Sequence, residues 1–209
     1  MSNNTRVYQI IVAPFFDQRV ETNDPLAIFS AIPFFDWAEK TLDISQVYAS
    51  IEEDPRTSKL SPDEKEHEAY LKLSRLQAKV AQAFFDIGER YECIDQFTYF
   101  SRSSGLDLEI RRLAEECSPE LHKRFSEGIP FDFKVEAIQA SFPADFDSPL
   151  KNLNIYGWTF FTPEEMDELL HAYDKIKQFE QLIYSDTWEE IKFALQSSEC
   201  DVFLFVDDL

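Results

Sequence analysis

The sequence predicts an α+β fold in a single domain over residues 1–209. Strand-like apolar segments lie near both ends of the sequence, and amphipathic helical patterns lie between them. The composition suits a buried core, because 44% of the residues are hydrophobic and 20 are Phe. We expect the two outermost strands to pair in one small sheet that packs against a long amphipathic helix and several shorter helices.

The first sixty residues predict one strand and two short helices. Residues 7–13 form a nearly continuous β-branched and aromatic run that Pro14 ends, which is typical of a central strand. Asp36 with Glu39 three positions later predicts the capping box of one short helix. A second short helix is expected over residues 43–50.

The clearest helical pattern begins at Ser61. The tetrapeptide 61–64 supplies a serine at the N-cap, a proline at the first helical position and a glutamate three residues after the cap. Apolar residues spaced alternately by four and three then predict one long helix with one buried face. The predicted stripe is Ala69, Leu73, Leu76, Val80, Ala83 and Ile87, continued by Tyr91 and Ile94 beyond Gly88. A coiled-coil dimer seam is the alternative, but three heptads with two alanines are more typical of a central helix in a globular core.

The second half of the chain continues the α+β pattern. The expected elements are a helix over 106–117, a short helix from Ser118-Pro119 to Gly128, a strand over 131–138, a loop over 141–154, a strand over 155–161, a helix opened by Thr162-Pro163-Glu164-Glu165, a helix over 188–195 and a strand over 201–206. The helix after Thr162 is expected to bury Met166, Leu169, Leu170, Tyr173 and Ile176.

The dipeptide Phe-Asp occurs five times, where residue frequencies alone give about two. The copies are Phe16-Asp17, Phe35-Asp36, Phe85-Asp86, Phe131-Asp132 and Phe146-Asp147. We interpret each as a buried ring beside a capping or turn aspartate, and exposed aromatic-acid recognition elements are the alternative.

No motif in the sequence names a reaction or a cofactor. Four scattered glycines exclude the glycine-rich phosphate cradles, and no signature of an activated serine or cysteine occurs. Three widely spaced cysteines without CxxC spacing favour a reducing cytoplasm over disulfides or zinc. The first apolar run is too short for a membrane span and lacks a secretory cleavage site.

Two Glu-x-x-His pairs have the spacing of a metal site, but their predicted orientation argues against one. Glu64 with His67 and Glu168 with His171 have the spacing of di-iron helical bundles. Helical geometry turns both pairs away from the apolar stripes of their helices, whereas bundle ligands must project inward. We therefore expect these four residues to face solvent.

Charge is the most informative property of the chain. The net charge is −20, which disfavours binding of bare nucleic acid or of an anionic membrane. Residues 161–209 contain 13 acids and three bases, so half of the imbalance lies in this segment. Some of these acidic residues lie in the first turns of a predicted helix, where negative charge is favourable. The others form either a solubilising face or a docking surface for a basic partner. The candidate partner-binding residues are Asp167, Glu168, Asp174, Glu189 and Glu190.

The segment from Ile155 to Met166, together with the helix behind it, Trp188 and the apolar terminal strand, resembles the C-terminal part of the YfbM-like family of small acidic bacterial proteins. Some members of this family resemble immunity proteins of toxin systems. The likeness covers about 50 residues. It implies a binding role and no catalytic residues.

The leading hypothesis from the sequence is a cytoplasmic, non-enzymatic acidic protein that binds and inhibits a basic protein, such as a toxin or a nucleic-acid-binding enzyme. A small enzyme with an unrecognised carboxylate or histidine site and a structural assembly subunit are the alternatives. The sequence does not predict the oligomeric state.

Overall fold

The computed structural model confirms the α+β fold and describes residues 4–22, 31–101, 105–117, 119, 155, 157–180, 182–197 and 200–208. The chain forms two compact units. Unit 1 comprises residues 1–12, 92–151 and 157–209, and unit 2 comprises residues 13–91 and 152–156. These units are compact parts found from contacts within the chain, and the single domain expected from the sequence stays a prediction.

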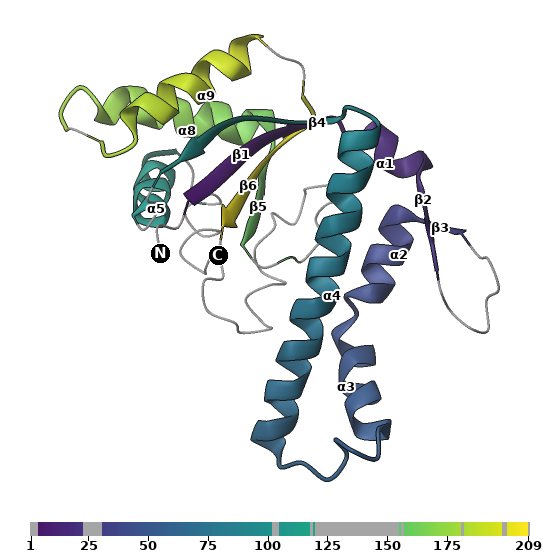
Figure 1. The fold of residues 1–209 in the computed structure, drawn as a ribbon. Coiled ribbons are helices and arrows are strands. Elements are labelled where there is room, and N and C mark those ends of the chain that lie inside the picture. Colours follow the sequence, from purple (N-terminus) through teal and green to yellow (C-terminus); the bar gives the residue numbers. More distant parts are fainter. Residues whose placement is uncertain are drawn as a thin grey trace. The chain divides into compact units, whose positions relative to one another are not determined.

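Unit 1 contains a four-stranded sheet in the order β4-β1-β6-β5 (Figure 1). The strands are β1 (Asn4–Ile10), β4 (Ile94–Phe100), β5 (Trp158–Phe161) and β6 (Val202–Asp208). All three pairings are antiparallel, and Val7 of β1 lies opposite Thr98 of β4 on one side and Phe205 of β6 on the other. The expected pairing of the first and last strands and the central position of the first are therefore confirmed. The first strand ends at Ile10 rather than at residue 13, because a short helix begins at Ala13.

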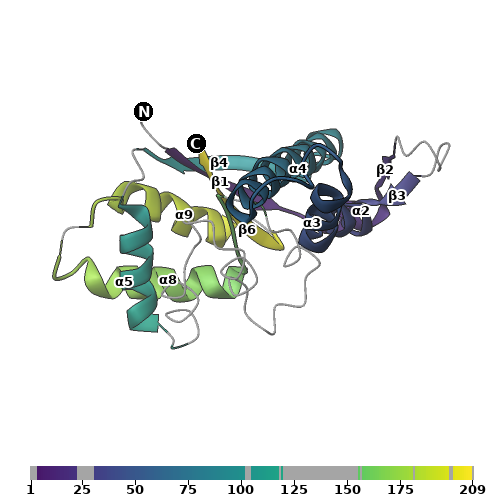
Figure 2. The same ribbon diagram turned by 90° about the horizontal axis from the view of Figure 1, so that it is seen from below.

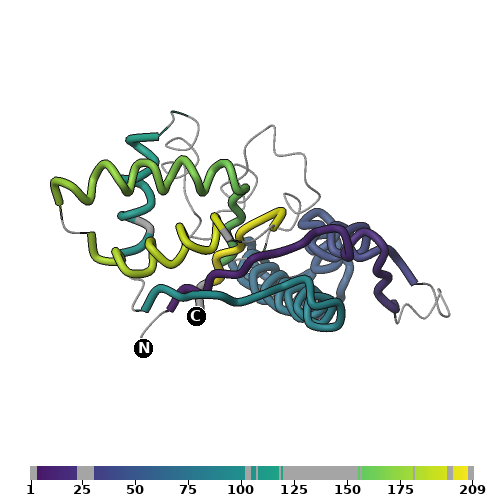
Figure 3. The backbone as a smooth tube through the Cα atoms, turned by 90° about the horizontal axis from the view of Figure 1, so that it is seen from above, coloured from purple at the N-terminus to yellow at the C-terminus, as the bar shows by residue number. Residues whose placement is uncertain are grey.

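Three helices cover one face of this sheet (Figure 2). They are α5 (Leu106–Cys117), α8 (Pro163–Ile176) and α9 (Ser185–Ser197). The side chain of Thr162 accepts a hydrogen bond from the Glu165 backbone, and the Glu165 carboxylate accepts one from the Thr162 backbone, so the predicted capping box of α8 is confirmed. Helices α8 and α9 run side by side in opposite directions (Figure 3).

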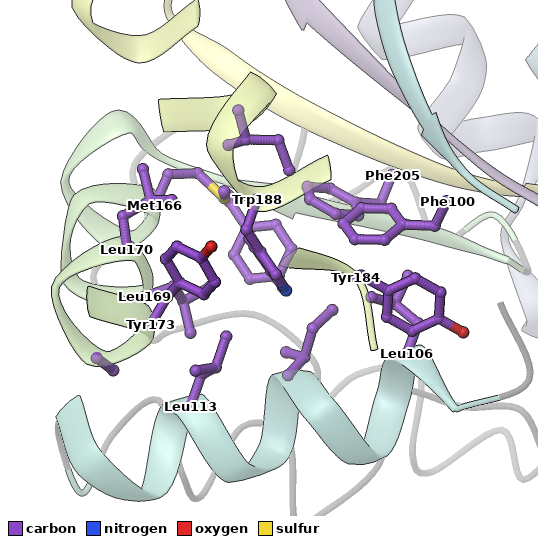
Figure 4. Packing of buried hydrophobic residues seen from close by; sticks show 14 of the residues in the cluster. Phe100, Leu106, Leu113, Met166, Leu169, Leu170, Tyr173, Tyr184, Trp188 and Phe205 are labelled. Atoms are coloured by element: carbon purple, nitrogen blue, oxygen red, sulfur yellow. The ribbon is translucent and has the colours of Figure 1, made fainter. Parts of the chain in front are cut away.

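The core of unit 1 lies between this sheet face and the three helices (Figure 4). Trp188 of α9 is fully buried and packs edge-on against Phe100 of β4, with ring centroids 5.3 Å apart. The five apolar positions predicted for the buried side of α8 are all buried, as expected. A largely aromatic core of this kind gains its stability mainly from removing apolar surface from water.

In the described part of unit 2, four helices accompany a short hairpin. The elements are α1 (Ala13–Asp17), β2 (Arg19–Glu21), β3 (Ala31–Pro33), α2 (Phe34–Thr41), α3 (Ile44–Glu53) and α4 (Pro62–Arg90). Asp43 caps α3 by accepting a hydrogen bond from the Ser45 backbone, and Ser61 and Glu64 form the predicted capping box of α4. The capping box predicted at Asp36 is wrong, because α2 begins two residues earlier, after Pro33, with no side-chain cap.

The long helix α4 differs from its prediction in two respects. Its buried face is formed by Ala69, Leu73, Gln77, Val80, Phe84, Ile87 and Gly88, whereas Leu76 and Ala83 are half-buried. The helix ends at Arg90, Glu92 adopts a positive φ of 51°, and Ile94 begins β4 instead of continuing the helix. A single left-handed residue suffices to end a helix, because the chain cannot continue its hydrogen-bond ladder beyond it.

Three of the Phe-Asp dipeptides belong to a longer repeat, Phe-Phe-Asp, that gathers in unit 2. The first ring of each copy, Phe15, Phe34 and Phe84, is fully buried. These three rings contact one another, with centroids 4.5 to 5.9 Å apart. The ring next to the aspartate is the outer one: Phe16 is 54% exposed, and its neighbours in the other two copies are half-buried. The buried ring is therefore not the one that the dipeptide interpretation named.

The elements expected over residues 118–128, 131–138 and 141–154 lie outside the described residues, apart from Pro119, as do Phe131-Asp132 and Phe146-Asp147.

Candidate functional site

A buried carboxylate of α5 joins this helix to α9 and to the connection that precedes α9. Glu109 of α5 is 6% exposed and accepts the indole N–H of Trp188 at 2.7 Å. Its other oxygen accepts the backbone N–H of Ile183, in the connection between α8 and α9, at 3.0 Å. The Trp188 N–H is fully buried and would otherwise lack a partner in a low-dielectric interior, so this carboxylate fixes the position of α9.

A second polar network joins the exposed sides of α8 and α9. Lys177 donates to Asp174 at 2.6 Å and to Glu189 at 2.7 Å, Lys192 also donates to Asp174, and Tyr173 donates to Glu189 at 3.0 Å. The hydrogen bonds from Lys177 and then Lys192 lower the pKa of Asp174, and the bond from Lys177 lowers the pKa of Glu189. Burial and the contact with Glu189 raise the pKa of Tyr173. Both carboxylates are therefore ionised at neutral pH.

The five predicted partner-binding residues have three kinds of surroundings. Asp167 and Glu168 lie on the exposed side of α8, where Asp167 pairs with His171 at 3.5 Å. Asp174 and Glu189 belong to the lysine network, and Glu190 accepts a hydrogen bond from Thr98 of β4. The network thus engages two of the three lysines in residues 161–209, so Lys177 and Lys192 neutralise carboxylates within the protein.

A groove of about 520 Å³ lies between α9 and the strands β1 and β4. It is lined by Gln9, Phe97, Asp186, Glu189, Glu190, Phe193 and Ala194. Two predicted residues, Glu189 and Glu190, thus meet here, together with a third carboxylate and two aromatic rings. Phe193 is 72% exposed, and Phe97 packs edge-on against Phe203 of the core with ring centroids 6.1 Å apart. Carboxylates beside aromatic faces are a favourable environment for a cation.

Asp186, Phe193 and Phe97 are not among the partner-binding residues predicted from the sequence. For the first two a signal existed, because positions 186, 189, 190 and 193 recur at helical spacing and therefore share one face of α9. For Phe97 no local signal existed, since it comes to the groove through the pairing of β4 with β1.

The surroundings of the three cysteines do not favour a nucleophilic thiolate. Burial and the nearby Glu168 carboxylate raise the pKa of Cys117 to about 11, and burial raises the pKa of Cys93 and of Cys200. A raised pKa keeps a cysteine in its weakly nucleophilic thiol form at neutral pH.

The Glu-x-x-His residues are exposed, as expected: Glu64 and His67 on α4, Glu168 and His171 on α8. Within the described part of the chain, no group of three or more His, Cys, Asp or Glu side chains is arranged to hold a metal ion. Among the described residues, no helix combines the length and the apolar character needed to cross a membrane.

Comparison with known proteins finds no matching family model, and no curated protein or solved structure shows significant similarity to the chain.

Proposed function

We propose that this chain is a non-enzymatic, acidic binding protein of the cytoplasm that binds and inhibits a basic protein, such as a toxin or a nucleic-acid-binding enzyme. The observation that carries the proposal is the excess of exposed carboxylates on α8 and α9 that are not paired with a lysine. Two of the three lysines in residues 161–209, Lys177 and Lys192, are bound to Asp174 and Glu189, while Asp167, Glu168 and Asp186 remain exposed.

A surface with this excess of negative charge attracts a basic partner over several ångströms and raises its association rate. The resemblance of the segment around Thr162 to the YfbM-like family supports the same kind of role, since some members of that family resemble immunity proteins. For a partner that normally binds nucleic acid, exposed carboxylates would take the place of phosphates.

The test begins with recovery of basic partners on the immobilised protein at low salt, followed by a salt titration. Binding of an authentic partner should weaken strongly as salt rises to about 0.5 M, because the Debye length falls to a few ångströms. The absence of any basic partner, or binding that ignores salt, would contradict the proposal.

A charge variant then separates binding from folding. Neutralising Asp167, Glu168 and Asp186 as amides removes three exposed charges that the lysine network does not use. The free energy of unfolding should change by less than about 0.5 kcal/mol for each substitution, whereas the association rate with the recovered partner should fall. Neutralising Asp174, Glu189 and Glu190 is a less clean test, because each accepts a hydrogen bond from another residue of unit 1.

A further inference from the structure

We propose that the groove between α9 and β4 receives an arginine side chain of the basic partner. This inference rests on the proposed function and adds to it a position on the surface and a chemical group. The charge complementarity between three carboxylates and a guanidinium identifies the occupant, and the aromatic rings in the groove favour arginine over lysine.

The exposed side of α9 carries a large aromatic side chain that the packing of the helix against the core does not explain. Trp188 and Ile191 are fully buried and anchor the helix to the core, so packing does not need a large apolar side chain on the opposite side. Phe193 nevertheless stands 72% exposed there and lines the groove together with Phe97. Large exposed aromatic side chains beside a concavity are typical of binding surfaces.

Two of the three carboxylates of the groove, Glu189 and Glu190, are held in place before any ligand arrives. Tyr173 and Lys177 donate to one oxygen of Glu189, and Thr98 donates to one oxygen of Glu190. Within the described residues, the second oxygen of each carboxylate makes no hydrogen bond and remains able to accept one. A cation that binds here therefore meets acceptors whose side-chain entropy is already lost, which favours affinity.

Guanidinium matches this arrangement better than ammonium does. Its plane can stack on an aromatic ring while its N–H groups donate to carboxylates at the edge, whereas a lysine ammonium is a strongly hydrated point charge. The groove volume of about 520 Å³ lies within the range of roughly 300–1,000 Å³ that is usual for ligand sites. It accommodates one such side chain with part of its backbone.

The test uses a fluorescently labelled hexa-arginine peptide and the full chain at fixed ionic strength, with a hexa-lysine peptide of equal charge beside it. Two pairs of variants match chemistry inside and outside the groove. Phe193→Ala is compared with Phe179→Ala, which removes an exposed ring that does not line the groove. Asp186→Asn, in the first turn of α9, is compared with Asp63→Asn, which removes an exposed charge in the first turn of α4.

We expect hexa-arginine to bind several-fold more tightly than hexa-lysine, and Phe193→Ala and Asp186→Asn each to weaken its binding five- to tenfold. The Phe179→Ala and Asp63→Asn variants should stay within twofold of the unaltered protein. Equal losses for both members of each pair, with no preference for arginine, would overturn the groove while leaving the attraction of a basic partner intact. Failure of hexa-arginine to bind would overturn the groove, and the partner recovery described above would then decide the proposed function separately.

Discussion

Glu109 and Trp188, on two different helices of unit 1, are joined by a buried hydrogen bond of 2.7 Å between a carboxylate and an indole N–H. The indole ring lies among Phe100, Tyr173 and Phe205, as Figure 4 shows. The bond therefore fixes a large ring at the centre of the core, and through it the helix that carries the groove.

Replacing Glu109 should destabilise unit 1 in proportion to the acceptors removed. Glu109→Gln keeps one carbonyl oxygen and leaves either the Trp188 or the Ile183 N–H without a partner, at a cost of about 1–2 kcal/mol. Glu109→Ala removes both acceptor oxygens, leaves the buried Trp188 N–H without a partner and should cost about 2–4 kcal/mol. Urea unfolding followed by Trp fluorescence measures both, with the exposed Glu116→Ala on the same helix as the control. Equal stability of Glu109→Ala and Glu116→Ala would contradict the role of the buried carboxylate.

Adjacent phenylalanines in one Phe-Phe-Asp copy should differ widely in their contribution. Phe15 is fully buried and stacks on Phe84 at 4.5 Å, so Phe15→Ala should lower the free energy of unfolding by about 3–5 kcal/mol. Phe16 is 54% exposed and contacts Phe35 at 5.3 Å, so Phe16→Ala should cost less than about 1 kcal/mol. Denaturant unfolding followed by far-ultraviolet circular dichroism compares the two variants. Similar losses for both would show that the repeat is not divided into inner and outer rings.

The lysine network predicts an acid-sensitive contribution to stability. The pKa of Asp174 in the folded protein lies below its ordinary value of 3.8, and that of Glu189 lies below 4.5. Because these pKa values are lowered, the network stabilises the folded protein at pH values above the ordinary pKa values of the two groups. This stabilisation is lost as the pH falls through their pKa values in the folded protein. Since both side chains are partly exposed and solvent screens their charges, we expect less than about 1 kcal/mol from each.

A comparison of urea midpoints at pH 7 and pH 3 measures this contribution. Asp174→Asn should reduce the difference in stability between the two pH values, whereas Asp167→Asn, which lies outside the network, should leave it nearly unchanged. An identical pH dependence in Asp174→Asn and the unaltered protein would refute the prediction.

The three cysteines should react slowly with a thiol reagent in the folded protein. Burial raises the pKa of Cys93 and of Cys200, and that of Cys117 reaches about 11, so little thiolate is present at pH 8. Ellman's reagent should modify the folded chain at least tenfold more slowly than the chain in 6 M guanidinium chloride. A cysteine that reacts as fast in the folded as in the unfolded chain would reveal an activated thiol.

Local sequence signals predicted the helices well. They did not predict β4, whose conformation depends on contacts with distant residues. The capping boxes at Ser61 and Thr162 involve residues three positions apart, so the sequence contains the whole interaction. Strand β4 was missed, since the amphipathic pattern of α4 continues into Ile94 and the hydrogen bonds that make this segment a strand come from β1. Tertiary pairing decided its conformation against the local pattern.

The candidate site shows the same limit. Counting charges identified Glu189 and Glu190, and both line the groove. The count gave no indication that Lys192 reaches Asp174 or that Thr98 reaches Glu190, because these contacts depend on how α9 lies against α8 and β4. Net charge therefore locates the acidic region, and only the fold determines which carboxylates are available to a partner.

The pairing of β1 with β6 has a consequence for the order of events during synthesis. Most of unit 2 is one continuous stretch, residues 13–91, so α2, α3 and α4 can come together soon after Arg90 leaves the ribosome. The sheet must wait much longer, because Val202–Asp208 lies between β1 and β5 and is translated after every other strand. Until then both neighbours of β6 present unpaired backbone groups, which are templates for pairing with another chain. A nascent or truncated chain that stops before Val202 would therefore be a substrate for chaperones and prone to aggregation, although all the residues of the groove had already been made.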